Sequence, residues 1–175
     1  MASTAPRLSP ETPDAGREPA TDAGFYSEYL DFLSNVERLH RLLLDVVKDE
    51  FERLGQLDIN SVQALLLFNV GDNEVTAGEL KSRGYYQGSN VSYNLKKLVE
   101  AGYLHHQRSE VDRRSVRIKL TDKGHVIRDA VAELFERHAQ TVAEDEVLGA
   151  DGVRGMNEGM RRIERFWMDR IRYIY

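Results

Sequence analysis

The side chains best suited to chemistry begin at Ser89, where polar and basic residues recur at helical spacing. Hydroxyl and amide groups hydrogen-bond the edges of bases, and lysine ammonium groups pair with phosphates. At about 100° per residue, Val91, Leu95 and Leu98 share one face of a helix. The outer side then carries Ser89, Ser92, Tyr93 and Lys96, flanked by Asn90 and Lys97. The pattern indicates recognition of nucleic acid, with a solvated helix face as the alternative.

A second group of charged side chains lies in a polar turn and the strand-like run that follows it. This group comprises Asp112, Arg113, Arg114 and Arg117. A guanidinium group is always charged and favours the negative potential of phosphates and of a narrow DNA groove. We therefore predict DNA contacts here, although an edge hairpin kept soluble by its charges would look similar.

The distribution of charge supports the same prediction. The 175-residue chain has a net charge of −5, yet residues 76–124 hold 10 basic and 5 acidic side chains. The segments on either side of this block are both acidic on balance. A basic block inside an acidic chain is typical of a phosphate-binding surface.

Other kinds of chemistry find little support in the sequence. The absence of Cys excludes disulfides, thiolate metal sites and thiol redox sensing. His105 and His106 are neighbours in a strand and face opposite ways, which is poor geometry for chelating a metal. Asp45 and Asp49 share a helix face that solvation explains better than catalysis. We therefore predict no metal, no cofactor and no enzymatic activity.

Two further expectations concern location. No apolar run approaches the roughly 20 residues of a membrane helix. The N-terminus lacks the apolar core of a signal peptide and carries acidic residues early, among them Glu11 and Asp14. The cytoplasm is the expected location.

The elements that must position these side chains follow from periodicity and capping residues. Residues 1–24 contain all four prolines and few large apolar side chains, so we expect a disordered tail. Thr76 and Glu79 form a capping box, and Thr121 caps a further helix. The segment from Gly149 to Gly152 is expected to break the helical pattern. We expect helices at about 25–54, 62–68, 77–83, 89–101, 122–146 and 153–172, and strands at 103–109 and 115–120. The helix at 62–68 can be capped by Asn60 or Ser61.

The order of these elements, with two short helices ahead of a hairpin, is that of a winged helix-turn-helix. It resembles the MarR family of bacterial transcription regulators over residues 25–175. The sharpest match is a pattern in which Asp-x-Arg is followed by any five residues and then by Leu-Thr-x-x-Gly. In this chain the pattern spans residues 112–124. The stretch LVEAGYL at 98–104 also resembles the family. The implied fold is mainly α with a small β-hairpin wing.

The resemblance implies a division of the chain into a winged helix DNA-binding domain at 57–124 and dimerisation helices at 25–56 and 125–175. The first and last helices have apolar faces too large for a small monomer, so pairing two copies would bury both. A two-fold dimer would also place two reading helices about one DNA turn apart, on a palindromic operator. The expected partners are therefore double-stranded DNA and a second copy of the chain.

The resemblance also implies roles for single residues. Arg114 is expected to enter the minor groove, with Asp112 orienting it, while Arg113 and Arg117 are candidates for phosphate contacts. Family members bind small aromatic or anionic effectors in a cleft beside the dimer helices. The candidate lining residues here are Phe51, Leu54, Leu67, Phe68 and Ile127, although core packing explains each of them equally well.

Within the family, the tracts at 84–103 and 40–51 resemble the LdtR-type subgroup, which is linked to L,D-transpeptidase expression and cell-wall remodelling. This resemblance implies control of cell-wall remodelling or stress genes. The alternative is a winged helix retained as a protein-interaction scaffold, without specific DNA readout.

Overall fold

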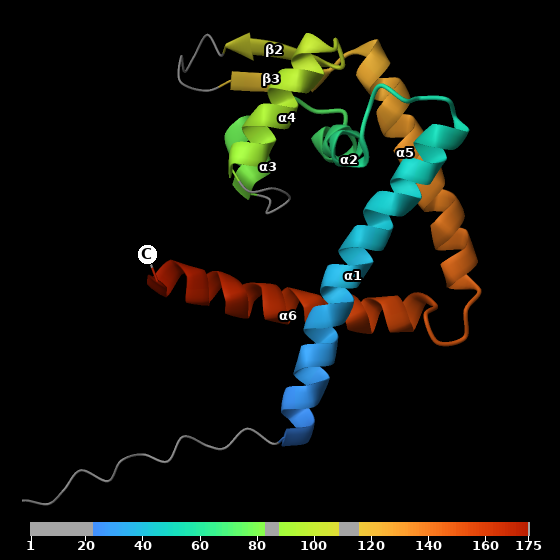
Figure 1. The fold of residues 1–175 in the computed structure, drawn as a ribbon, viewed down its shortest axis with the longest axis vertical. Coiled ribbons are helices and arrows are strands. Elements are labelled where there is room, and N and C mark those ends of the chain that lie inside the picture. Colours follow the sequence, from blue (N-terminus) through green and yellow to red (C-terminus); the bar gives the residue numbers. More distant parts are fainter. Residues whose placement is uncertain (1–22, 83–87, 109–115, 175) are drawn as a thin grey trace, which may run out of the picture. The chain divides into compact units, whose positions relative to one another are not determined.

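The computed structural model describes residues 23–82, 88–108 and 116–174. The chain divides into two compact units, residues 1–41 and 42–175, and each is described by itself. Figure 1 shows the elements in chain order: α1 (Ala23–Arg53), α2 (Ser61–Val70), β1 (Val75–Thr76), α3 (Ala77–Ser82), α4 (Gly88–Glu100), β2 (Leu104–Arg108), β3 (Val116–Leu120), α5 (Asp122–Ala143) and α6 (Ala150–Ile174). The predicted fold class, mainly helical with a small β wing, is confirmed.

The first unit is described from Ala23 and consists of the N-terminal part of α1. Rings stack along it, with centroids 6.4 Å apart for Phe25 and Tyr29 and 6.3 Å apart for Tyr29 and Phe32. Phe25, Leu30 and other large apolar side chains of this part are exposed. The helix begins two residues before the predicted boundary of the tail, so the tail prediction was wrong for Ala23 and Gly24. Residues 1–22 lie outside the described residues.

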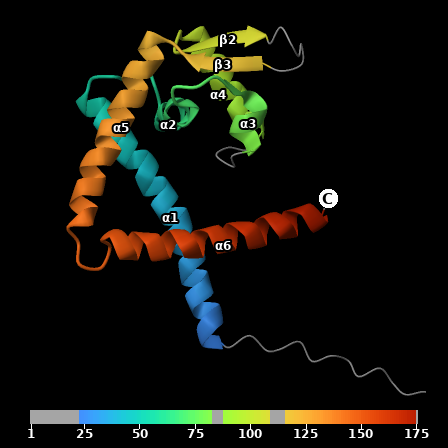
Figure 2. The ribbon, with the colours of Figure 1, turned by 180° about the vertical axis from the view of Figure 1, so that it is seen from behind.

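The core of the second unit forms where α2 packs against α5, which lie side by side in Figures 1 and 2. Helix α2 is almost entirely apolar, and Ala64, Leu66, Leu67 and Val70 are buried. Its first turn is capped by Asn60, whose Oδ1 accepts the Gln63 N–H at 2.9 Å. A helix with so few polar side chains must bury most of its surface, as the sequence predicted.

The sheet has three antiparallel strands in the order β1-β3-β2, one more than the predicted hairpin. Val75 pairs with Ile118, and Thr76 pairs with Arg117. A strand of two residues is too short to show an alternating pattern, so the sequence could not reveal it. The predicted capping box follows at once, because the Thr76 N–H donates to Glu79 Oε2 at 2.6 Å and the Glu79 N–H donates to Thr76 Oγ1 at 3.1 Å.

The two long strands present different faces. Their inner face buries Leu104, Ile118 and Leu120 against the helices, and α4 packs on this side. Their outer face carries the exposed side chains His105, Gln107, Arg117 and Lys119. Adjacent residues of a strand point to opposite faces, which separates His105 from His106 as predicted.

Helix α6 begins at Ala150, so the predicted break at 149–152 was wrong at its C-terminal end. A Cβ on Gly152 would lie 2.1 Å from the Val147 carbonyl oxygen. Gly152 therefore permits a close approach of backbone at the start of α6 rather than ending a helix. The turn before it is held by Asp145, whose carboxylate accepts the N–H groups of Val147 and Leu148 at 2.8 and 2.7 Å. These hydrogen bonds lower the pKa of Asp145.

A buried carboxylate ties the end of α1 to α5 within the second unit. Glu50 is only 9% exposed. Its oxygens accept hydrogen bonds from Arg53 Nε at 2.9 Å and Nη2 at 2.8 Å, and from Arg137 Nη2 at 2.5 Å. The hydrogen bond from Arg53 and then that from Arg137 lower the pKa of Glu50 from 4.5 to about 2, against the opposing effect of burial. A buried charge with two guanidinium partners is satisfied, and removing it leaves both without an acceptor.

We predict that Glu50→Gln lowers the free energy of unfolding by about 2 kcal/mol at pH 7, because charged hydrogen bonds are lost. The folded-state pKa lies below the unfolded one, so this stabilisation is complete above pH 4.5 and is lost as the pH falls toward 2. Urea unfolding followed by circular dichroism between pH 7 and pH 3 measures both effects. The control is Glu52→Gln, which breaks only the exposed pair with Lys48. Equal stability of Glu50→Gln and wild type at pH 7 would contradict the prediction.

Candidate nucleic-acid interface

Helix α4 presents the polar face that the sequence predicted. Val91, Leu95 and Leu98 are buried in the core, whereas Ser92, Tyr93, Lys96 and Lys97 are exposed. Ser89 and Asn90 belong to the first turn of α4, but their side chains lie outside what the structure describes. The helical periodicity of this stretch is thus confirmed, and it leaves one continuous polar face turned to solvent.

The exposed face of α4 combines an aromatic ring with cations. Tyr93 is 61% exposed, and Lys97 Nζ lies 6.0 Å from the centroid of its ring. At the C-terminal end of the helix, Glu100 pairs with Lys96 at 3.8 Å and Lys97 at 3.4 Å. Exposed pairs of this kind contribute little to stability, so both ammonium groups can exchange the carboxylate for a phosphate at small cost. This face can therefore offer hydroxyl groups to bases and ammonium groups to a backbone.

The predicted wing residues divide into two groups. Asp112, Arg113 and Arg114 lie outside the described residues. Arg117 is described, and its Nη1 donates to Glu74 Oε2 at 3.0 Å on the outer face of the sheet. Because α4 packs on the inner face, the structure does not bring Arg117 together with the polar face of α4.

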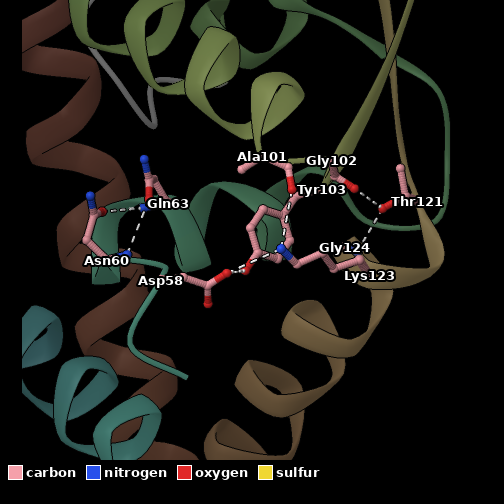
Figure 3. A network of polar contacts seen from close by, with 9 residues as sticks. All are labelled: Asp58, Asn60, Gln63, Ala101, Gly102, Tyr103, Thr121, Lys123 and Gly124. Carbon is pink, nitrogen blue, oxygen red and sulfur yellow. Dashed lines mark hydrogen bonds and ion pairs between the residues drawn. The ribbon is translucent and has the colours of Figure 1, made fainter. Parts of the chain in front are cut away.

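The position of α4 depends on a junction around Tyr103, which sequence reasoning did not single out. Figure 3 shows how residues from four segments meet there. The Tyr103 hydroxyl donates to Asp58 Oδ2 at 2.7 Å, and the Tyr103 N–H donates to the Leu98 carbonyl at 2.9 Å. Lys123 Nζ lies 3.9 Å from the centroid of the Tyr103 ring and donates to Asp58 Oδ2 at 3.2 Å. The end of α4, the start of β2 and the start of α5 are thus joined at one aromatic residue.

Hydrogen bonding and burial at this junction shift the pKa values of Asp58 and Tyr103 in opposite directions. The hydrogen bond from Tyr103, followed by that from Lys123, lowers the pKa of Asp58. Burial, followed by the same hydrogen bond to Asp58, raises the pKa of Tyr103. The phenol therefore stays protonated and donates, while the carboxylate stays charged and accepts.

The Leu-Thr-x-x-Gly motif gains a physical explanation at the same place. Thr121 Oγ1 donates to the Gly102 carbonyl at 2.8 Å and accepts the Gly124 N–H at 3.0 Å, so it caps α5 and ties it to the end of α4. The Thr121 N–H donates to the Tyr103 carbonyl at 3.1 Å. A Cβ on Gly124 would lie 2.2 Å from that same carbonyl oxygen. The motif glycine is therefore the signal that could have revealed the junction, because only glycine leaves room for the Tyr103 backbone.

Three of the five candidate effector residues lie in the core of the second unit. Phe51, Leu67 and Ile127 are buried in the core, and Leu54 is partly exposed after the last turn of α1. Phe68 is partly buried and packs edge-to-face on Phe135, with ring centroids 5.3 Å apart. For the buried three, core packing accounts for the apolar side chain. The hollows found among the described residues are lined by other side chains.

We predict that Gly124→Ala lowers the free energy of unfolding by about 2–3 kcal/mol, because the added methyl group forces Tyr103 and α5 apart. Thermal or urea unfolding measures the loss. The matched control is Gly78→Ala, where the nearest atom to the new Cβ is Thr76 Oγ1 at 3.7 Å, an ordinary contact. Losses of equal size at the two positions would show that the close approach to Tyr103 is not the cause.

Metal binding and membrane insertion find no support among the described residues. Across residues 23–82, 88–108 and 116–174, no group of three or more His, Asp or Glu side chains is arranged to hold a metal ion. Among the helices of that same part of the chain, none is both long enough and apolar enough to cross a membrane.

Comparison with known proteins gives one matching family model and one clear relative. The model is the winged helix DNA-binding domain, which matches residues 59–124. The relative is the exopolysaccharide II synthesis transcriptional activator ExpG of Rhizobium meliloti (strain 1021). It is 30% identical over 148 residues, which cover 83% of this chain and 74% of ExpG.

Solved structures agree on the fold. The transcriptional regulator SlyA is 16% identical with a TM-score of 0.69, over 83% of this chain and 99% of SlyA. Streptococcus pneumoniae FabT in complex with DNA is 21% identical with a TM-score of 0.61, over 82% of this chain and 98% of FabT. A mutant MarR from E. coli complexed with operator DNA is 20% identical with a TM-score of 0.61, over 82% of this chain and 99% of that one. At these identities the likeness establishes the fold alone.

Proposed function

The chain belongs to the family of winged helix transcriptional regulators that includes the activator ExpG, and from that premise we propose that it is a regulator of the MarR type and how it recognises DNA. It is a transcription regulator with a winged helix DNA-binding domain rather than an enzyme. We propose that two copies form a homodimer that reads a palindromic operator, with one α4 in each of two successive major grooves.

The observation that carries this proposal is the continuous polar face of α4. Ser92 and Tyr93 are exposed in the N-terminal half of the helix, where side chains of a recognition helix reach base edges. In the proposed complex, Ser89, Asn90, Ser92 and Tyr93 read bases, and Lys96 and Lys97 contact phosphates. The DNA complexes reported for FabT and MarR, which share the fold, support DNA as the partner.

For the wing, we propose that Arg114 enters the minor groove, oriented by Asp112, and that Arg113 contacts the backbone. An Arg117 contact with phosphate requires its guanidinium to leave Glu74. We rank Arg117 last among the proposed contacts, because its side chain lies on the outer face of the sheet.

Dimerisation is supported by apolar side chains that the described chain leaves exposed. One stripe of α6 carries Val153, Met156, Met160 and Ile171, which are separated by three, four and eleven residues, and each is at least a third exposed. On α1, Leu39, Leu43 and Val46 are exposed in the same way. We propose, as the division into functional parts, that residues 25–56 and 125–175 pair the two copies and that 57–124 binds DNA.

The regulated genes and the effector are further proposals. ExpG is named for activating exopolysaccharide II synthesis, and the LdtR-type subgroup is linked to cell-wall remodelling; both processes build the cell surface. We propose target genes of this kind, and response to a small aromatic or anionic effector. Of the candidate effector residues, Leu54 and Phe68 are the two that retain exposed surface. A regulator of this kind would act in the cytoplasm, where the DNA is.

DNA recognition is tested with the purified protein, its own upstream DNA and scrambled DNA of equal length. Fluorescence anisotropy measures binding to each DNA over a range of salt concentrations. We predict that Tyr93→Ala loses about tenfold in preference for the native DNA, because a base contact is removed. Lys97→Ala weakens binding to both DNAs alike and reduces the salt slope by about 1. Arg114→Ala abolishes most of the preference.

The control for these variants is Lys48→Ala, which removes an exposed lysine from α1 and leaves α4 and the wing unchanged. Equal and weak binding to the two DNAs, insensitive to Tyr93→Ala and Arg114→Ala, would contradict DNA readout. That outcome would favour the alternative, a winged-helix scaffold that docks another protein.

We predict that Met160→Glu on the apolar stripe of α6 converts the dimer to a monomer, because a charge would be buried between the two copies. Light scattering after size-exclusion chromatography measures the mass. The matched control is Arg162→Glu, which introduces the same side chain on the far side of the helix. A protein that is monomeric before substitution, or a dimer unaffected by Met160→Glu, would contradict the proposed interface.

A further inference from the structure

The outer face of the wing sheet contains two adjoining hollows, of which the proposed function uses only Arg117, the last-ranked of its DNA contacts. Both are lined by His105 and Lys119, which pair across β2 and β3. The smaller hollow, of about 260 Å³, is completed by Glu74, Gln107 and Arg117. The larger one, of about 440 Å³, extends over the start of α5 and is completed by Gly102, Leu120, Thr121, Asp122, Lys123 and His125.

In the described part of the chain, some of the cationic side chains around these hollows are paired with a carboxylate, and one is not. Arg117 is neutralised by Glu74 at 3.0 Å, and Lys123 by Asp58 at 3.2 Å. Among the described residues, by contrast, the side-chain ammonium group of Lys119 has no hydrogen-bond or ion-pair partner. The strands contribute no carboxylate to this face, and Asp122 is the acidic side chain that lines the larger hollow. The uncompensated ammonium group on this face is therefore that of Lys119, while Asp122 lies at the rim formed by the start of α5.

We propose that this pair of hollows binds a small phosphate-bearing anion through Lys119 and His105. An ammonium group and an imidazole side by side supply hydrogen-bond donors to phosphate oxygens, and the Gln107 amide can supply another. The larger hollow, of about 440 Å³, lies within the range of roughly 300–1,000 Å³ that small-ligand sites occupy.

The geometry favours a small anion over operator DNA as the source of the phosphate. Helix α4 packs on the inner face of the sheet, while His105 and Lys119 lie on the outer face. DNA held by the polar face of α4 would therefore not face Lys119.

The larger hollow also has a consequence for regulation, and this part depends on the proposed function. Gly102, Thr121 and Lys123 line it and also form the junction around Tyr103. An anion held there would contact the segment that sets α4 against α5, so bound phosphate is expected to change operator affinity. A ligand shifts such an equilibrium only as far as its affinities for the two states differ.

The first experiment follows backbone amide NMR shifts of the full-length protein as sodium phosphate is added at pH 7, with sodium chloride of equal ionic strength as the reference. We expect saturable shifts at 102–107 and 117–125 that chloride does not produce. Lys119→Gln is expected to weaken phosphate binding at least tenfold and His105→Gln to weaken it less, while the control Lys48→Gln leaves it unchanged. Both target side chains are exposed, so the variants are expected to fold, which circular dichroism checks.

Shifts that follow ionic strength equally in both salts, or that persist in Lys119→Gln, would overturn the proposal. The second experiment measures operator binding by Lys119→Gln without phosphate. We expect an unchanged salt slope; a decrease of about 1 would identify Lys119 as a DNA contact and overturn the small-anion site. Because the NMR titration contains no DNA, it tests the anion site even if the proposed DNA function fails.

Discussion

The carbonyl oxygen of Tyr103 is the point on which the arrangement of the DNA-binding domain depends. It accepts the Thr121 N–H at 3.1 Å and lies where a Cβ of residue 124 would be only 2.2 Å away. The same residue places its ring under Lys123 and its hydroxyl on Asp58. Because α4 ends just before Tyr103 and α5 begins just after Thr121, this contact decides how α4, the sheet and α5 are held together. These contacts fix where the polar face of α4 lies relative to the sheet and α5.

Helix α5 is the support that the rest of the second unit shares. Its first turn closes the junction at Tyr103, its middle packs against α2, and near its C-terminal end Arg137 reaches Glu50 of α1. The contact at Tyr103 depends on the absence of a side chain at Gly124. The packing against α2 depends on apolar burial, and the contact of Arg137 depends on the buried charge of Glu50, which is paired. Each would fail for a different physical reason, and each lies on a different turn of the same helix. Helix α5 therefore contacts both the segment that follows α4 and the end of α1.

The wing sheet separates the positive charge of the chain into two surfaces. Lys96 and Lys97 lie on α4, which packs against the inner face, while Arg117 and Lys119 lie on the outer face. Among the described cations of the block at 76–124, the two lysines of α4 therefore lie on a different surface from Arg117 and Lys119. These cations differ in how they are compensated, since Arg117 has Glu74 as its partner and both lysines of α4 share Glu100. One block of sequence can in this way serve two anionic ligands, the operator and the small phosphate we propose.

Local patterns in the sequence determined the helices, their caps and the buried face of α4, because each depends on neighbours three or four residues apart. The family motif likewise pointed to the wing and to Thr121 as a cap. Tertiary structure alone decided the contacts between distant residues: Asp58 with Tyr103, Glu74 with Arg117 and Glu50 with Arg137. It also decided that two residues at 75–76 form a strand, and that Gly152 lies inside a helix. Such features arise where one part of the backbone meets another, and that meeting depends on packing that no local pattern contains.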